Sequence, residues 1–352
     1  MSDEIKDDVV QVHKRRVRYS GTHPKKFEEK YKELNPLKYQ NDIEKIIKKG
    51  KTPAGMHIPI MVNEILEFLD IKPGQIGYDA TLGYGGHTLK MLERLDGKGH
   101  LYATDVDMIE SVKTEDRIRS LGYKEDIFTI KRINFCNIDK VSDEKFDFVL
   151  ADLGVSSMQI DNPLRGFSFK VDGPLDLRLN PTCGVTASER LRELNFSELV
   201  GMLEENSDEP YAKEIATEVF RTFKRGEAID TTKKLYNVIE RALDFLPNKD
   251  KKENVKKSCQ RVFQALRIDV NSEFEVLYEF LEKLPNCVKS GGRIAILTFH
   301  SGEDRLVKKA FKEGLKCGIY SSVCRDVIRP SAEECFTNPR SKSTKMRWAI
   351  KN

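Results

Sequence analysis

A glycine-rich segment followed by an acid carries the most informative chemistry in this sequence. Three glycines follow an apolar run at residues 76–80: Gly83, Gly85 and Gly86. A second apolar run at residues 101–103 ends at Asp105. Glycine lets the backbone approach a ligand closely, and a helix that starts just afterwards offers unpaired N–H groups and a positive dipole end. The pattern predicts a strand, a ligand-binding loop, a helix and a second strand that ends in a carboxylate.

The spacing of the acid indicates the kind of ligand. Asp105 lies 22 residues after Gly83, at the tip of the second strand, where a carboxylate can bind both hydroxyls of a ribose. The glycines do not complete the G-x-G-x-x-G pattern, because its last position is Thr88. This disfavours a dinucleotide and favours a nucleoside cofactor without a pyrophosphate, such as S-adenosylmethionine. The alternative, that the glycines only shape a turn, leaves the strand, helix and acid around them unexplained.

A second acid follows another buried strand. The apolar run at 146–151 leads directly into Asp152. In an open α/β sheet the ligand crevice lies outside the carboxyl ends of the strands. We therefore expect Asp105, Asp152 and the loop near Phe135 to converge on one ligand, although Asp152 could instead cap a helix or a turn.

The elements that position these acids alternate between apolar runs and amphipathic helices. Near-continuous apolar strands such as 146–151 indicate a parallel sheet buried on both faces, hence an α/β, Rossmann-like fold. Strand signals stop after Gln159, and helical patterns dominate until they resume at 293–299, followed by a polar loop from His300 to Arg305. We expect four stretches: a basic N-terminal extension and linker (1–55), the first part of the sheet domain (56–159), a helical insertion for substrate recognition (160–262), and the second part of the sheet domain (263–352).

Composition narrows the class of protein. The chain has 352 residues, of which 39% are hydrophobic and 33% charged, and no window reaches the apolar length of a membrane span. No apolar signal segment opens the sequence, so we expect a cytoplasmic protein that does not bind membranes. The seven cysteines form no C-x-x-C pair, and the spacing of Cys317, Cys324 and Cys335 fits no usual zinc site. We expect free thiols and no bound metal.

A basic arm precedes the expected fold. The net charge of +4 is too small to identify a nucleic-acid-binding protein. The arm nevertheless combines cations with aromatic residues, which suits a nucleic-acid backbone and its bases. Its basic residues include Lys14, Arg15, Arg16 and Arg18, and its aromatic residues Tyr19, Phe27 and Tyr31. A solvated tail explains the same charges equally well.

Six motifs resemble a known family. In chain order they are HIPIMVNEIL, DATLGYGGHT, DLGVSSMQIDNPLRGFSFKVDGPLDLR, RVFQALRIDVNSE, TFHSGEDRLVK and NPRSKS. They resemble the S-adenosylmethionine-dependent methyltransferases that modify N4 of a cytosine in 16S ribosomal RNA, over roughly residues 56–352. The resemblance implies a class I methyltransferase fold with a helical insertion, and the small ribosomal subunit as partner. It also implies cofactor contacts at Gly85, Gly86, His87, Asp105, Phe135, Asp152 and Gln159.

The implied reaction has specific requirements. The amine of cytosine is a poor nucleophile because its lone pair is delocalised into the ring, so positioning should dominate. Asp152 is the expected catalytic acceptor for the amine proton. No aromatic residue follows in the DLGV segment to stack on the base. Phe167 or Phe169 would supply that platform, unless both belong to the core.

Other functions remain open at the level of sequence. A methyltransferase for a small molecule or a protein would use the helical insertion as its own pocket. A nonenzymatic RNA-binding assembly factor would keep the cofactor fold without turnover, and a dehydrogenase is disfavoured by Thr88. The sequence leaves the target nucleotide and the oligomeric state undetermined, a homodimer included.

Overall fold

The computed structural model describes residues 59–352, which belong to a compact unit spanning residues 57–352. The basic arm and the linker predicted at residues 51–55 lie outside the described residues. No helix in the described part of the chain has the length and apolar character that crossing a membrane requires.

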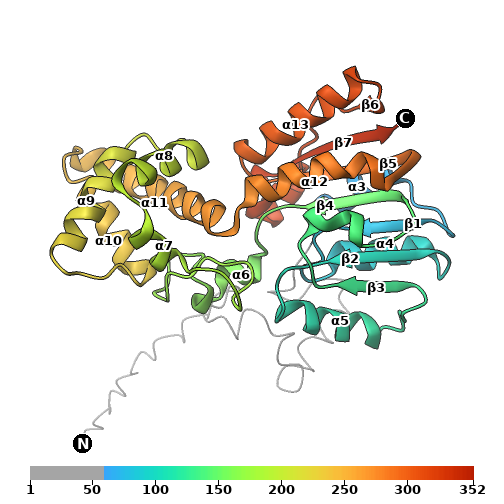
Figure 1. Cartoon of the computed structure of the whole chain (residues 1–352), viewed down its shortest axis with the longest axis horizontal. Coiled ribbons are helices and arrows are strands. Elements are labelled where there is room, and N and C mark those ends of the chain that lie inside the picture. The colour runs from blue at the N-terminus through green and yellow to red at the C-terminus, as the bar shows by residue number, and fades with distance from the viewer. Residues whose placement is uncertain (1–58) are drawn as a thin grey trace, which may run out of the picture. The chain divides into compact units, whose positions relative to one another are not determined.

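A seven-stranded sheet forms the centre of this unit (Figure 1). Its strands are β1 (Ile76–Asp79), β2 (His100–Thr104), β3 (Phe128–Lys131), β4 (Phe146–Asp152), β5 (Val288–Thr298), β6 (Tyr320–Val323) and β7 (Lys345–Lys351). Their spatial order is β3-β2-β1-β4-β5-β7-β6. The first five run parallel and β7 is antiparallel to both neighbours. The predicted mostly parallel sheet is confirmed, while the short strand β6 was not predicted.

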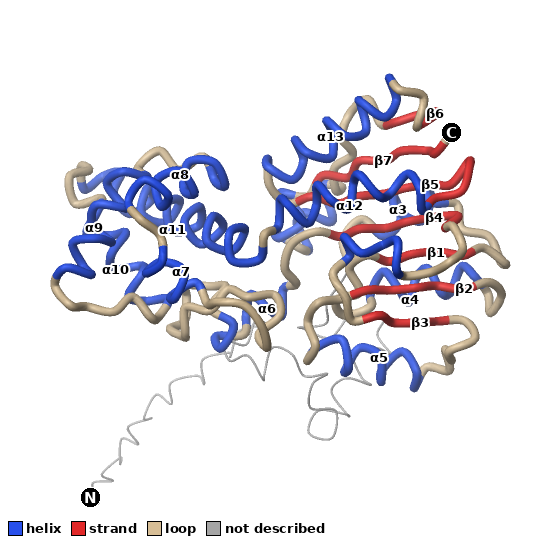
Figure 2. The backbone as a smooth tube through the Cα atoms, in the orientation of Figure 1, coloured by secondary structure: helices blue, strands red, loops and turns tan. Residues whose placement is uncertain are grey.

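Helices cover both faces of the sheet (Figure 2). One face packs against α3 (Val62–Leu69), α4 (Gly86–Leu95) and α5 (Glu110–Ser120), and the other against α12 (Glu273–Cys287) and α13 (Ser301–Lys316). Apart from Asp147 and Asp152, the sequence of β4 is apolar, because alternate side chains of the strand enter different cores. Phe148 and Leu150 join the first core, whereas Val149 and Ala151 join the second.

The predicted helical insertion has a core of its own, which extends from Leu175 to Leu266. Its helices are α7 (Ala187–Glu193), α8 (Phe196–Ser207), α9 (Ala212–Lys224), α10 (Thr232–Ala242) and α11 (Asn248–Asn271), grouped from green to orange in Figure 1. Capping boxes at Thr186 and Asn195 set the starts of α7 and α8. Helix α11 is unbroken, so the expected boundary between residues 262 and 263 falls inside it.

Short segments complete the edge of the sheet where the parallel strands end. They are η2 (Phe135–Lys140), α6 (Ser157–Asp161), η3 (Pro163–Arg165), α14 (Ala332–Thr337) and η4 (Pro339–Ser343). These connections after the strands are where a ligand crevice is expected in this topology, because the strand order reverses between β1 and β4.

Candidate active site

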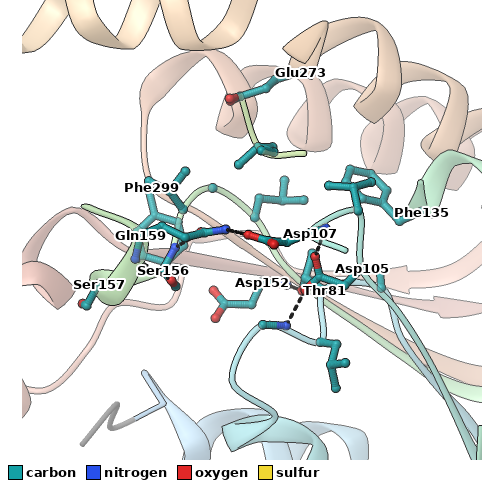
Figure 3. Close-up of a pocket in the computed structure, with 18 of the residues that line it drawn as sticks. Thr81, Asp105, Asp107, Phe135, Asp152, Ser156, Ser157, Gln159, Glu273 and Phe299 are labelled. Atoms are coloured by element: carbon teal, nitrogen blue, oxygen red, sulfur yellow. Dashed lines mark hydrogen bonds between the residues drawn. The ribbon is translucent and has the colours of Figure 1, made fainter. Parts of the chain in front are cut away.

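A cavity of about 470 Å³ lies at the carboxyl ends of β1, β2, β4 and β5. Six of the seven predicted cofactor residues line it: Gly86, His87, Asp105, Phe135, Asp152 and Gln159. Its opposite side comes from the end of α11, the start of α12 and η4. Figure 3 shows Glu273 of that opposite side across the cavity from Asp105 and Asp152.

Gly85 does not line the cavity. A Cβ atom at this position would lie 2.9 Å from Cδ1 of Ile118, and its φ of +68° is left-handed. Gly85 therefore allows the turn that starts α4, while Gly83 and Gly86 face the cavity. No side chain caps α4, so its first N–H groups remain available beside the cavity.

Asp105 is oriented by backbone groups. Its Oδ2 accepts a hydrogen bond from the N–H of Gly83 at 2.8 Å, and its Oδ1 accepts one from the N–H of Asp107 at 2.8 Å. Burial raises the pKa of Asp105 to about 6, and the two backbone hydrogen bonds oppose that rise. Each carboxylate oxygen retains a further lone pair, so both can accept ribose hydroxyls.

Asp107 is a site residue that the sequence analysis missed. Its side chain is 1% exposed, and its Oδ2 accepts from Arg165 Nη1 at 2.6 Å and from Gln159 Nε2 at 3.1 Å. Burial acts to raise the pKa of Asp107, but the hydrogen bond and charge of Arg165 hold it below its usual value. Its Oδ1 accepts the N–H groups of Ile109 and Glu110, which caps α5. The sequence offered one indication of this role, because Asp107 follows Asp105 by two residues in the segment DVD.

Arg165 connects this cofactor side to the helical insertion. Its Nη2 donates to the carbonyl oxygens of Arg178 at 3.1 Å and Leu179 at 2.8 Å. Asn271 at the end of α11 binds the same loop, since it accepts from the N–H of Leu179 and donates to the carbonyl of Leu177. The loop thus links Asp107 to α11 through side-chain hydrogen bonds.

Asp152 and His87 form a buried pair. Nδ1 of His87 lies 3.5 Å from Oδ2 of Asp152, and Nε2 lies 2.9 Å from the carbonyl oxygen of Ile60. Because a carbonyl only accepts, we assign the proton to Nε2, which leaves Nδ1 of a neutral ring facing the carboxyl group. A proton between the two atoms stabilises such a pair.

The electrostatics of the pair place that proton on Asp152. Burial, together with the charge of Glu303, raises the pKa of Asp152 to about 7. Burial lowers the pKa of His87. Oδ1 of Asp152 is buried and has no hydrogen-bond partner among the described residues. An orphaned carboxyl oxygen in a cavity indicates a ligand group that completes it.

Three further charged residues line the cavity, Arg267 and Glu273 on the opposite side and Glu303 at the start of α13, and the sequence analysis assigned none of them to the site. Arg267 donates from Nε to Oε1 of Glu273 at 2.8 Å and from Nη2 to Oε2 at 2.9 Å. Oε2 of Glu303 accepts from the N–H of Phe299 at 2.8 Å. The only available signal was that Glu303 follows the fifth strand of the predicted sheet, in the polar loop.

The prediction that Phe167 or Phe169 forms a base platform in this cavity is wrong. Both pack against the core of the helical insertion, where the ring centroid of Phe169 lies 5.4 Å from that of Phe263. Neither lines the cavity, whereas Phe135 and Phe299 do. Phe135 is held by an edge contact with Phe280 at 5.2 Å.

Glu273, His300 and Glu303 are the one group in residues 59–352 with a spacing that suits a metal ion. The local bonding argues against a cation there. Glu273 is already neutralised by Arg267, and Nδ1 of His300 accepts the N–H of Glu303 to cap α13. Nε2 of a neutral His300 then carries the proton and cannot ligate a metal.

The sheet order, the glycine turn and the acids at the strand ends define an S-adenosylmethionine-dependent class I methyltransferase. Residues 54–352 match the MraW methylase family, and the chain belongs to that family. The resemblance noted in the sequence is thereby confirmed.

Three relatives illustrate the extent of the similarity. The Ribosomal RNA small subunit methyltransferase H 1 of Agathobacter rectalis is 67% identical over 341 residues, covering 96% of this chain and 98% of the relative. The methyltransferase H 2 of Alkaliphilus metalliredigens is 60% identical over 347 residues, covering 98% and 99%. The methyltransferase H of Mesomycoplasma hyopneumoniae is 37% identical over 310 residues, covering 84% and 100%.

The residues of the cavity fit S-adenosylmethionine. The two oxygens of Asp105 suit a ribose diol, and the uncapped start of α4 suits a carboxylate. When bound, the cofactor supplies a methyl group activated by a positively charged sulfur. The carboxylate of Asp105 favours a cation in this cavity.

Proposed function

We propose that this enzyme transfers a methyl group to the exocyclic N4 of a cytidine in 16S ribosomal RNA of the small ribosomal subunit. The observation that carries the proposal is Asp152, which lines the cofactor cavity at the end of β4 and has one carboxyl oxygen, Oδ1, without a hydrogen-bond partner among the described residues. The printed names of the relatives, all small-subunit ribosomal RNA methyltransferases, support the class of substrate. We infer from such a substrate that the enzyme acts in the cytoplasm.

The site residues divide by role. Gly86, His87, Asp105, Phe135 and Gln159 bind the cofactor, with Gly85 acting through the turn that it permits. Gln159 is held at the cavity by Asp107, and its Oε1 accepts the N–H of Ser156 at 2.9 Å. Asp152 borders both the cofactor and the target amine and is the catalytic residue.

Asp152 handles the proton that methyl transfer releases. As the N4–CH₃ bond forms, the nitrogen must lose one of its hydrogens to return to a neutral amine. The ionised form of Asp152 accepts that proton, with Oδ2 facing Nδ1 of His87 at 3.5 Å. A pKa of about 7 keeps a useful fraction of the carboxylate ionised near neutral pH. Positioning of the amine supplies the rest of the acceleration.

The target base must leave its stack to reach this cavity. Phe299 lines the cavity after β5 and replaces Phe167 and Phe169 as the aromatic surface on which the base stacks. The helical insertion at 160–262 provides RNA recognition, and α11 carries that contact into the cavity through Arg267 and Asn271.

A methyl-transfer assay tests the proposal. The full-length enzyme is incubated with labelled S-adenosylmethionine and small ribosomal subunits purified from cells that lack the enzyme. We expect one labelled cytidine, identified by nuclease digestion and mass spectrometry as the N4-methyl form. Label on another base or atom would overturn the proposal. Label in a protein or small molecule without RNA would instead favour a methyltransferase of another substrate class.

A further inference from the structure

We propose that Arg267 reads the pairing edge of the target base and that Glu273 holds Arg267 in position. This inference rests on the proposed function, because it concerns how the same cavity selects cytosine. Asp152 and Arg267 then face different groups on one edge of the base, the first as an acceptor and the second as a donor.

The hydrogen bonds of Arg267 leave one nitrogen unused. Nε and Nη2 donate to the two oxygens of Glu273, whereas Nη1 donates to no acceptor in the described part of the chain. The side chain of Arg267 is only 14% exposed and lines the cavity. A largely buried guanidinium that lines a cavity and has unused N–H groups indicates a ligand that accepts hydrogen bonds, because arginine has no acceptor of its own.

The position of the guanidinium is set by the junction of two helices. Ser272 has a left-handed φ of +48°, which ends α11 and starts α12 at Glu273. Asn271 anchors this junction to the loop at Leu177 and Leu179. The bidentate contact with Glu273 then fixes the plane of the Arg267 side chain. Arg267 is therefore preorganised before any ligand enters.

Glu303 interacts electrostatically with residues on both sides of the cavity. Its charge helps to raise the pKa of Asp152, after burial. Its own pKa is kept low because His300 and Arg267 outweigh the effect of burial. The Glu303 carboxylate is thus within electrostatic range of both Asp152 and Arg267, and all three residues line one cavity.

Cytosine matches this arrangement. Its pairing edge presents the N4 amine as a donor, followed by the acceptors N3 and O2. With the amine at Asp152, one N–H group of Arg267 Nη1 is shared between the adjacent acceptors N3 and O2. Uracil presents an acceptor at O4 and a donor at N3, so both contacts would be mismatched. Adenine has an amine beside an acceptor but lacks an equivalent of O2.

A substrate lacking one acceptor provides the sharpest test. Small ribosomal subunits are reconstituted with RNA that carries either cytidine or 3-deazacytidine at the methylated position found in the assay above. For the wild-type enzyme we expect kcat/KM to fall about 10- to 100-fold on 3-deazacytidine, because N3 no longer accepts from Arg267. For Arg267→Gln we expect a similar loss already on cytidine and no further loss on 3-deazacytidine. Any difference in the reactivity of the amine between cytidine and 3-deazacytidine affects the wild-type enzyme and Arg267→Gln equally, so it cancels when the two losses are compared.

Matched variants separate positioning from folding. Lys257→Gln removes a cation from the same helix, where Lys257 pairs with Glu253 at the surface, and should retain wild-type activity and full discrimination. Glu273→Gln should lower kcat more than it raises KM and should weaken discrimination. Arg267→Lys retains the charge without the planar fork and gives the same test if Arg267→Gln does not fold.

Two results would overturn the inference. One is full discrimination between cytidine and 3-deazacytidine by a folded Arg267 variant. The other is a loss of S-adenosylmethionine affinity in that variant by calorimetry, which would make Arg267 a cofactor residue. Failure of the wild-type enzyme to methylate cytidine would contradict the proposed function itself and is seen before any variant is made.

Discussion

The two walls of the cavity are built by different means. The strand-end wall, made by the loops after β1, β2 and β4, holds Asp105 with backbone N–H groups. The helical wall, made by Arg267, Glu273 and Glu303, depends mainly on the ion pair between the Arg267 and Glu273 side chains. Backbone donors fix a carboxylate whatever the neighbouring side chains are. The strand-end wall therefore suits an invariant cofactor, and the helical wall suits recognition of one particular substrate.

The Arg165–Asp107 ion pair joins the two walls, and its loss has the largest expected effect. Arg165→Gln leaves the carboxylate of Asp107 buried without its charged partner, which costs about 3 to 5 kcal/mol of the free energy of unfolding. Affinity for S-adenosylmethionine should fall as well, because Asp107 also orients Gln159. Urea denaturation and calorimetry measure the two effects.

An exposed ion pair serves as the control for that variant. Lys234→Gln breaks the contact with Asp230, in which both side chains are about half exposed, and should leave stability nearly unchanged. Equal stability of Arg165→Gln and Lys234→Gln would mean that the two walls are not coupled through Asp107.

The next effect concerns turnover. Asp152→Asn should lower kcat about 100-fold while changing RNA affinity little, because an amide cannot accept the proton from N4. The kcat of the wild-type enzyme should rise with pH through about 7, where Asp152 ionises, and the variant should lack this rise. A variant that loses only cofactor affinity would make Asp152 a binding residue of the strand-end wall.

The same substitution should stabilise the folded protein at high pH. The folded-state pKa of Asp152 is raised from 3.8 to about 7, so its stability contribution is complete below pH 4 and is lost as pH rises through 7. Asparagine does not ionise and avoids this loss. The free energy of unfolding of Asp152→Asn, relative to that of the wild-type protein, should be about 2 kcal/mol larger at pH 8.5 than at pH 5.5. An equal gain at both pH values would contradict the raised pKa.

Most of the strand-end wall could be predicted from the sequence. Asp105 and Asp152 each follow an apolar strand, and parallel strands bring such ends together. The exception is Asp107, whose partners Gln159 and Arg165 lie 52 and 58 residues away. No local pattern indicates a contact at that distance along the chain.

The helical wall was not predictable, because the fold and not a motif assembles it. Arg267 lies in a helix rich in charged residues, where a solvated face is the usual expectation, yet its side chain is only 14% exposed. Helix α11 packs in the insertion core along most of its length, and only its last residues line the cavity. The same ambiguity explains the error at Phe169, because an aromatic residue after a strand end fits a cavity and a second core equally well.

A smaller effect is expected at Asp105. Asp105→Ala should weaken S-adenosylmethionine binding by about 1 to 3 kcal/mol, because two ribose hydroxyls lose a charged acceptor. The wild-type affinity should also fall below pH 6, where Asp105 becomes protonated, whereas that of the variant should not. Asp126→Ala changes an exposed acid and is the control. Calorimetry that finds unchanged affinity in a folded Asp105→Ala protein would remove this residue from the cofactor site.

The smallest effect is expected for the basic arm, which should contribute to RNA binding but not to either wall of the cavity. Deletion of residues 1–50, which lie outside the described residues, should leave S-adenosylmethionine affinity and kcat at saturating substrate unchanged, because the predicted linker at residues 51–55 separates this segment from the sheet domain.

RNA affinity at low salt should decrease, since Lys14, Arg15, Arg16 and Arg18 can each neutralise a phosphate. Each lost contact should make the slope of log affinity against log salt shallower by about 0.7 to 0.9. A full-length protein with these four residues changed to glutamine should reproduce the shallower slope, because it removes the charges and retains the chain. If the deletion weakens binding but the glutamine variant does not, the aromatic residues of the arm supply the contact. Equal affinities and equal slopes in all three proteins would make the arm a solvated tail and leave RNA capture to the helical insertion.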